Sequence, residues 1–290
     1  MTSVDDADAP RFGARLIEDT MSPWPAIALI EALGLDRPSP RAGDPLPPFW
    51  HWLYFLEPVP SGAVGRDGHA APGHWLPRTG LPRRMWAGGG LSFQAPLPLG
   101  APARRHISVG PATRKTGRSG PLAFVAVEHW IEGAAGLAVT ERQDLVFRED
   151  PPPGSCLPAP GSAPPAGEKA PDRATCSQRW CLGTAALFRY SALTYNGHRI
   201  HYDAAYARGV EGYPGVVVHG PLLATLLFET ARVAWPSRFE AGFTGRFDFR
   251  AVAPVFADEP FETCASVRGD HLSLWVRGSD GRLAMRATLR

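Results

Sequence analysis

Hydrophobic and polar residues alternate along much of the first half of the chain, as they do in half-buried antiparallel strands. Gly and Pro separate these runs from one another. A different pattern over 22–34 predicts a short helix, with Ser22 as a candidate N-cap, Pro23 in the first turn and Gly34 at the end. The strands predicted for this half are 51–57, 91–97, 103–115, 122–132 and 137–149.

The second half repeats this order of elements. Residues 221–234 are mostly apolar and predict a buried helix, because Pro221 suits a first helical turn and Pro236 marks an end. One buried helix followed by antiparallel strands implies an α+β fold in which the sheet wraps the helix. The strands predicted after this helix are 243–252, 261–269, 271–279 and 282–290.

Between the two halves, Pro, Gly, Ala and Ser dominate residues 150–172. Proline has a fixed φ and no backbone donor, so this segment suits neither a helix nor a sheet. It also has too little apolar mass to form a core of its own. The sequence therefore predicts an N-terminal domain over 1–149, a linker over 150–175 and a C-terminal domain over 176–290. A long surface loop within one domain is the alternative.

The composition is that of an ordinary globular protein, with 44% hydrophobic and 20% charged residues among 290. A net charge of +2 is too small to indicate a nucleic-acid partner. The N-terminus lacks the basic and apolar runs of a signal peptide, and no apolar stretch approaches the ~20 residues of a membrane span. The cysteines form no CxxC pair, which favours reduced thiols. We therefore expect a cytoplasmic protein without a membrane partner.

The segment 195–203 brings Asn196, His198 and His201 close together in the sequence. Histidine accepts and donates protons near neutral pH, and the asparagine amide is able to hold a water or a carbonyl oxygen. Two other interpretations stay open. The histidines could have only structural roles, or they could bind a metal together with Asp203. The HxxH spacing alone is weak evidence for a metal, and we expect none.

His219 and Gly220 stand directly before the predicted helix 221–234. Backbone N–H groups at a helix start, here that of Gly220 above all, stabilise negative charge on a carbonyl oxygen. We expect His219 itself to be bonded near the helix start. A water holder, a base and an oxyanion site are together what the addition of water to an enoyl thioester requires.

Nucleotide-binding motifs are missing from the sequence, since neither a P-loop nor a GxGxxG run after a strand occurs. The glycine run 88–90 has no lysine or helix in the position that a phosphate loop needs. It instead predicts a β-bulge or a close approach of two backbones.

Two blocks of the sequence resemble MaoC-like double hot-dog hydratases and dehydratases. Residues 191–203 followed by GYPGVVVHGPLLA resemble the active-site segment and the entry to the central helix. Residues 49–100 resemble the non-catalytic hot-dog repeat of the subgroup that contains mesaconyl-C4-CoA hydratases, itaconyl-CoA hydratases and mitochondrial type 2 3-hydroxyacyl-thioester dehydratases. The resemblance implies two tandem hot-dog domains, each an antiparallel sheet wrapped around a central helix, with the chemistry in the C-terminal one.

In that family an aspartate, an asparagine and a histidine occupy the positions that match Asn196, His198 and His201. Asparagine does not titrate, so Asn196 cannot act as a base. The resemblance therefore implies that His201 transfers the proton, Asn196 orients the water and the Gly220 N–H polarises the thioester carbonyl. It assigns His198 and His219 to the neighbouring wall of the substrate site.

The reaction that the resemblance implies is the reversible hydration of an enoyl-CoA, with coenzyme A as part of the substrate and no other cofactor. A short dicarboxylic acyl group of the mesaconyl-C4-CoA or itaconyl-CoA type is expected, and its free carboxylate would need a cation. The candidate cations are Arg83, Arg84 and Arg199. The alternatives are a 3-hydroxyacyl-ACP or -CoA dehydratase of fatty-acid or polyketide metabolism and a hot-dog acyl-CoA thioesterase.

The N-terminal repeat is expected to supply the second sheet of a pseudo-dimer and to take no part in the chemistry. Residues 67–69, Asp-Gly-His, are its nearest approach to a catalytic cluster, and they predict a turn. The protein would then be a monomeric pseudo-dimer, or two such chains would form a homodimer.

Overall fold

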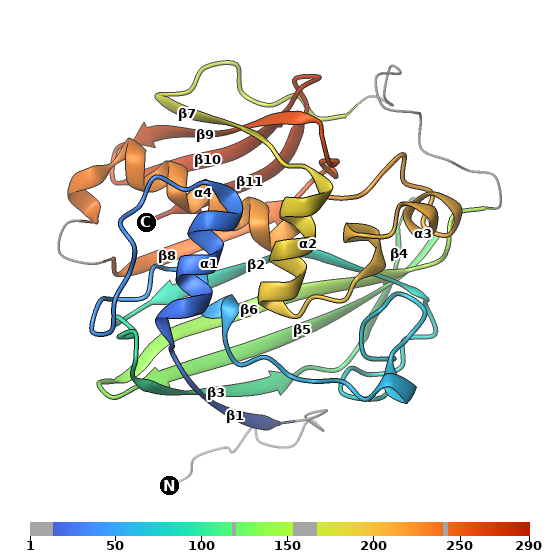
Figure 1. Cartoon of the computed structure of the whole chain (residues 1–290). Helices are drawn as coiled ribbons and strands as arrows, with labels where there is room; N and C mark the ends of the chain where they lie inside the picture. The colour runs from blue at the N-terminus through green and yellow to red at the C-terminus, as the bar shows by residue number, and fades with distance from the viewer. Residues whose placement is uncertain (1–13, 118–119, 153–166, 240–242) are drawn as a thin grey trace, which may run out of the picture.

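One antiparallel sheet dominates the computed structural model, which describes residues 14–117, 120–152, 167–239 and 243–290 (Figure 1). The strands described are β1 (Arg15–Thr20), β2 (Arg83–Phe93), β3 (Pro102–Val109), β4 (Thr113–Gly117), β5 (Gly120–Gly133), β6 (Gly136–Arg148), β7 (Cys176–Cys181), β8 (Gly245–Ala251), β9 (Pro260–Arg268), β10 (His271–Gly278) and β11 (Leu283–Leu289). The helices described are α1 (Pro23–Leu33), α2 (Thr184–Thr194), α3 (Ala204–Gly209) and α4 (Gly220–Ala234), with the 3-10 turns η1 (Trp50–Leu53), η2 (Ser61–Ala63), η3 (Arg199–His201) and η4 (Pro236–Arg238).

The strand order shows one plan used twice. Across the sheet it runs β1-β3-β5-β6-β2-β8-β11-β10-β9-β7, and β4 pairs with β5 beside this path. With β4 left out, each half has five strands. From the edge to the centre, both halves place their first, third, fourth, fifth and second strands in that order. The strands β2 and β8 pair antiparallel in the middle, so the two halves share one continuous sheet.

The glycine run 88–90 lies at this junction, where β2 pairs with β6 on one side and with β8 on the other. A Cβ atom at Gly89 would lie 2.1 Å from the carbonyl oxygen of Arg142, a distance at which no side chain fits. The strand register shifts between Trp86 and Gly88, so a bulge precedes the run. The predicted bulge and close backbone approach are both confirmed.

Helix α4 is the central helix of the C-terminal half, and it packs against β7, β9, β10 and β11 (Figure 1). Every residue from Leu222 to Ala231 is buried. A helix buried to this extent has few polar side chains, and the three that α4 buries are Thr225, Glu229 and Thr230. The prediction of this helix is confirmed.

The N-terminal half covers its strands in a different way. Its helix α1 ends, as predicted, at Gly34, whose φ of 62° is left-handed, and it packs against α2 and η1. Irregular chain between η1 and β2 covers β3, β5 and β6, because Leu76 and Leu81 are buried in a cluster with residues of these strands. The face of these strands that this irregular chain covers forms one wall of the cavity between the two halves.

The prediction of a strand over 51–57 is wrong. The chain there forms η1, and Phe49 and Phe55 on either side of it have positive φ values of 74° and 58°. A half-buried strand points alternate side chains toward solvent, whereas Trp50, His51 and Leu53 are all buried. A run of aromatic and apolar residues also occurs in a segment that is buried on all sides. Here that run predicted a strand that the structure does not contain.

Other strand predictions differ mainly in their limits. The strand predicted over 91–97 is the end of β2, and the one predicted over 103–115 is divided into β3 and β4 around Gly110. The remaining six match β5, β6 and β8–β11 to within a few residues. The sequence did not predict helix α2 or the strands β1 and β7. These two strands are short and lie at the sheet edges.

Part of the predicted linker, residues 153–166 with Cys156, lies outside the described residues. The described end of this segment packs onto the C-terminal half, because Ala170 is buried beside Trp275 and its N–H donates to the carbonyl oxygen of Gly281 at 3.0 Å. The limits of the two domains and of the linker stay a prediction. In the described part of the chain, Cys176, Cys181 and Cys264 are free thiols.

Among the helices that the structure describes, none combines the length and the apolar character needed to cross a membrane.

Candidate active site

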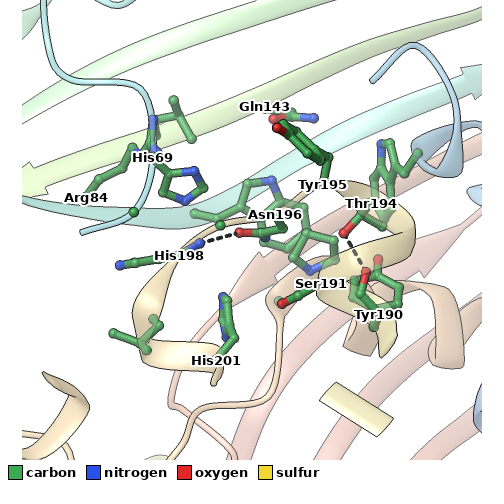
Figure 2. A pocket seen from close by; sticks show the side chains of 18 of the residues that line it. His69, Arg84, Gln143, Tyr190, Ser191, Thr194, Tyr195, Asn196, His198 and His201 are labelled. Atoms are coloured by element: carbon green, nitrogen blue, oxygen red, sulfur yellow. Dashed lines mark hydrogen bonds between the residues drawn. The ribbon is translucent and has the colours of Figure 1, made fainter. Parts of the chain in front are cut away.

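A cavity of about 760 Å³ lies between the two halves of the chain. Its apolar wall includes Met85 and Leu145 of the N-terminal half and Val255 of the C-terminal half. Polar side chains gather where the segment after α2 faces β2 and the preceding loop, as Figure 2 shows. These residues are His69, Arg84, Gln143, Ser191, Asn196, His198 and His201.

The turn after α2 positions the first two predicted site residues. Tyr195 ends the helix in a left-handed conformation with a φ of 52°, and the chain then turns back toward the cavity. The Asn196 Oδ1 accepts a hydrogen bond of 3.1 Å from the backbone N–H of His198 (Figure 2). This local bond fixes the asparagine side chain and leaves its Nδ2 to donate into the cavity.

His201 lies in η3 and is held by one hydrogen bond. Its Nδ1 lies 2.7 Å from the carbonyl oxygen of Val217, so Nδ1 carries the proton and donates it. The other nitrogen, Nε2, makes no hydrogen bond within the described residues and is a free acceptor. Burial lowers the pKa of His201 to about 3, so the imidazole is neutral at physiological pH.

His219 packs against the ring of His201. The two rings stack with their centroids 3.7 Å apart, and the His219 Nε2 lies 2.8 Å from the Ser191 hydroxyl. Burial lowers the pKa of His219 well below its usual value, so both stacked rings are neutral. His219 does not line the cavity, whereas His201 does. The sequence assigned His219 to the wall of the site, and the structure places it behind that wall.

Gly220 is the first residue of α4, and it lines the cavity. A Cβ atom there would lie 2.6 Å from Cε3 of Trp86, which belongs to the N-terminal half. The indole therefore packs directly on the glycine, and a helix start with its free N–H groups opens into the cavity beside it. The predicted oxyanion donor and the predicted base thus line the same cavity.

His198 and Arg83 meet at a buried carboxylate. The Arg83 Nε donates to the Glu211 Oε2 at 2.7 Å, and the His198 Nε2 lies 3.8 Å from the Glu211 Oε1. The side chains of Arg83 and Glu211 are both buried. Burial raises the pKa of Glu211, but the neighbouring His198 and the charge of Arg83 outweigh this and hold it below its usual value. His198 lines the cavity, and Arg83 lies behind it.

The predicted cation Arg199 does not face the cavity. Its guanidinium donates to the Asp203 carboxylate at 2.7 Å and lies 4.3 Å from the centroid of the Tyr206 ring. Asp203 in turn caps α3 by accepting from the backbone N–H of Tyr206. The structure thus gives Arg199 and Asp203 a local role in holding η3 against α3.

The N-terminal half contributes residues to the site that the sequence did not identify. His69 lies with its ring centroid 4.9 Å from that of His198, although residues 67–69 predicted only a turn. The turn is present, since the Gly65 carbonyl accepts from the Gly68 N–H. A histidine at the end of a polar turn was the available signal, but its contact with His198 joins distant parts of the chain and has no local signature.

The family of type 2 hydroxyacyl-thioester dehydratases matches residues 49–257. The mesaconyl-C4-CoA hydratase of Chloroflexus aurantiacus is 44% identical over 94% of this chain and 93% of its own. The mitochondrial type 2 hydroxyacyl-thioester dehydratase of Schizosaccharomyces pombe is 28% identical over 80% of each chain.

Solved structures identify the fold. A Mycobacterium tuberculosis protein with a double hot-dog fold has a TM-score of 0.55 and 15% identity over 97% of both chains. A MaoC-like dehydratase has a TM-score of 0.65 and 14% identity over 98% of both chains. The prediction of a double hot-dog α+β fold is therefore confirmed.

Proposed function

Since the chain belongs to the type 2 hydroxyacyl-thioester dehydratase family, we propose that it adds water reversibly to an enoyl-CoA whose short acyl group carries a free carboxylate, as mesaconyl-C4-CoA does. The observation that carries the proposal is the free Nε2 of the neutral His201, which faces the same cavity as the N-terminal end of α4. The 44% identity to a mesaconyl-C4-CoA hydratase supports the choice of acyl group.

The thioester carbonyl would lie at the start of α4 in this mechanism. The Gly220 N–H would donate to the carbonyl oxygen as the β carbon is attacked, because negative charge then moves onto that oxygen. Trp86 packs on Gly220 at this end of the cavity. One well-placed donor of this kind contributes roughly 10²–10³-fold to the rate.

His201 would transfer the proton in both steps. Its Nε2 takes a proton from the water as the new C–O bond forms at the β carbon, and the imidazolium then returns that proton to the α carbon of the enolate. No other base is needed, and all atoms of the water end in the product. A lowered pKa makes the imidazolium a stronger acid, which favours the return of the proton, and makes the neutral ring a weaker base toward the water.

Asn196 would position the water for this attack. Its Oδ1 is already bonded to the His198 N–H, so its Nδ2 is the group that donates to the water oxygen. An aspartate at this position would accept from the water and compete with His201 for the proton. The asparagine therefore does not compete with His201 for this proton.

The dehydration of longer 3-hydroxyacyl thioesters is the second candidate function. The extent of the cavity favours it, because its wall continues past the polar cluster to Trp75, Ile107 and Leu145 of the N-terminal half. A short acyl group would leave this apolar part unfilled, whereas a linear chain would bury its surface there. The 28% identity to a mitochondrial dehydratase is consistent with this alternative.

A panel of thioesters distinguishes these functions. We expect the purified protein to remove the enoyl absorbance of mesaconyl-C4-CoA with a higher kcat/KM than that of crotonyl-CoA or of a long-chain 2-enoyl-CoA. A preference for the long-chain thioester would support the dehydratase. Release of a free thiol, detected with DTNB, would support a thioesterase and contradict the proposal.

A further inference from the structure

We infer that Arg84 and His69, both from the N-terminal half, form the subsite that binds the free carboxylate of the acyl group. The inference rests on the proposed function and adds the residues that determine its specificity. Of the three arginines predicted for this role, Arg83 is committed to Glu211 and Arg199 to Asp203. Arg84 alone among these three lines the cavity.

Charge balance in the cavity wall supports this assignment. Arg15 and Arg105 also line the cavity, and both pair with the carboxylate of Glu57. Arg84 makes no side-chain hydrogen bond and no salt bridge within the described residues, and its Nη2 is buried without a partner. The nearby charge of Asp67 acts on Arg84 without forming a salt bridge. A buried guanidinium without an anion is costly, and a bound carboxylate would remove that cost.

Arg83 and Arg84 are neighbours at the start of β2, and the packing of Glu211 separates their roles. The side chain of Arg83 reaches Glu211 behind the wall, whereas Arg84 lines the cavity. Figure 2 shows Arg84 beside His69, with His198 next in the row toward His201. Burial lowers the pKa of His69 well below its usual value, so this ring is neutral and donates one hydrogen bond.

The loop that carries His69 is fixed to the catalytic loop. The backbone N–H of Arg199 donates to the backbone carbonyl oxygen of Asp67 at 2.8 Å. Gly68 and Gly197 touch through their backbones, because a Cβ atom on Gly68 would lie 1.9 Å from the Gly197 carbonyl oxygen. The subsite in one half of the chain is therefore held at a set position relative to His201 in the other.

This position suits the chemistry of a mesaconyl group joined to coenzyme A at C4. Its free carboxylate is attached to the β carbon, which is the carbon that water attacks. The carboxylate must then lie next to the base and its water, and the row from Arg84 through His69 and His198 to His201 meets that requirement. A planar guanidinium binds a carboxylate through two parallel hydrogen bonds.

The test compares two saturated thioesters, succinyl-CoA and butyryl-CoA, which differ by a carboxylate in place of a methyl group and are not hydrated. We expect calorimetry to show that the wild-type protein binds succinyl-CoA more tightly, and that Arg84→Met weakens succinyl-CoA binding on the order of 10- to 100-fold with little effect on butyryl-CoA. Arg84→Lys should restore part of the difference. Arg179→Met, which changes an 80% exposed side chain on β7, is the matched control.

Equal losses for both thioesters in Arg84→Met would show that Arg84 binds the phosphates of coenzyme A, and the inference would be overturned. A wild-type protein that binds both thioesters equally would overturn it as well. Because neither thioester reacts, these outcomes are independent of the hydration assay. A protein that prefers succinyl-CoA but hydrates no enoyl-CoA would retain the subsite and lose the proposed function.

Discussion

Replacing His201 with asparagine should lower kcat for enoyl-thioester hydration by roughly 10²–10⁴-fold, the range for loss of a positioned general base. Asparagine keeps a donor near the position of Nδ1, so the hydrogen bond to the Val217 carbonyl is retained. It removes Nε2, which is the only atom of this side chain that faces the reaction. The substitution thus separates the chemical role of His201 from its role in packing.

A matched control for this substitution is His106→Asn, because His106 lies on β3 with a side chain 46% exposed and does not line the cavity. The control should keep the wild-type kcat. Urea unfolding of both variants establishes that each one folds. If His201→Asn keeps more than a tenth of the wild-type kcat, another group is the base and the proposed mechanism is wrong.

Acidification from pH 7.5 to 5.5 should lower the free energy of unfolding by at least roughly 4 kcal/mol. His129, His201 and His219 are buried, and burial lowers the pKa of His129 to about 4 and that of His201 to about 3. The pKa of His219 is also well below its usual value. Each folded-state pKa lies below the value of the unfolded chain, so the unfolded chain binds more protons as the pH falls through 6.5.

These three sites account for roughly 4 kcal/mol, and His69, whose pKa burial also lowers, adds to the loss in the same direction. One proton that binds only to the unfolded chain costs about 1.4 kcal/mol for each pH unit below the unfolded pKa. Burial raises the pKa of the carboxylate Glu141, but its bond to His51 and the neighbouring His129 outweigh this and lower the pKa to about 2, so its own effect lies below pH 4.5, outside this range. Urea unfolding at the two pH values measures the difference. In His129→Gln the difference in unfolding free energy between the two pH values should be smaller by about the contribution of one histidine. An unfolding free energy that does not change between the two pH values would contradict the burial of neutral histidines.

Much of the fold could be predicted because several local signals have one physical meaning. A long apolar run after Pro221 identified α4, and Gly34 marked the end of α1 through its left-handed conformation. The glycine run 88–90 indicated a close backbone approach, although only the structure shows that it joins the two halves. The resemblance in residues 191–203 identified a segment that lines the cavity.

The errors in the fold and site come from contacts between distant parts of the chain. The apolar run 51–57 carries no information on how many sides of it are covered, and so η1 was predicted as a strand. The contribution of His69 depends on the backbone contact between Gly68 and Gly197, which no local pattern encodes. For the same reason, the sequence could not separate Arg84 from Arg83, since only the packing of Glu211 makes that distinction.

The most direct test of the central claim follows the oxygen of the added water. In H₂¹⁸O the wild-type protein should place one ¹⁸O atom on the β carbon of mesaconyl-C4-CoA as a hydroxyl group, in a product whose thioester is intact. Mass spectrometry of the product and of its fragments gives the position of the label, and His201→Asn should form that product at least roughly 10²-fold more slowly. Label found in a released carboxylate, or no labelled product, would contradict the assignment of this cavity to thioester hydration.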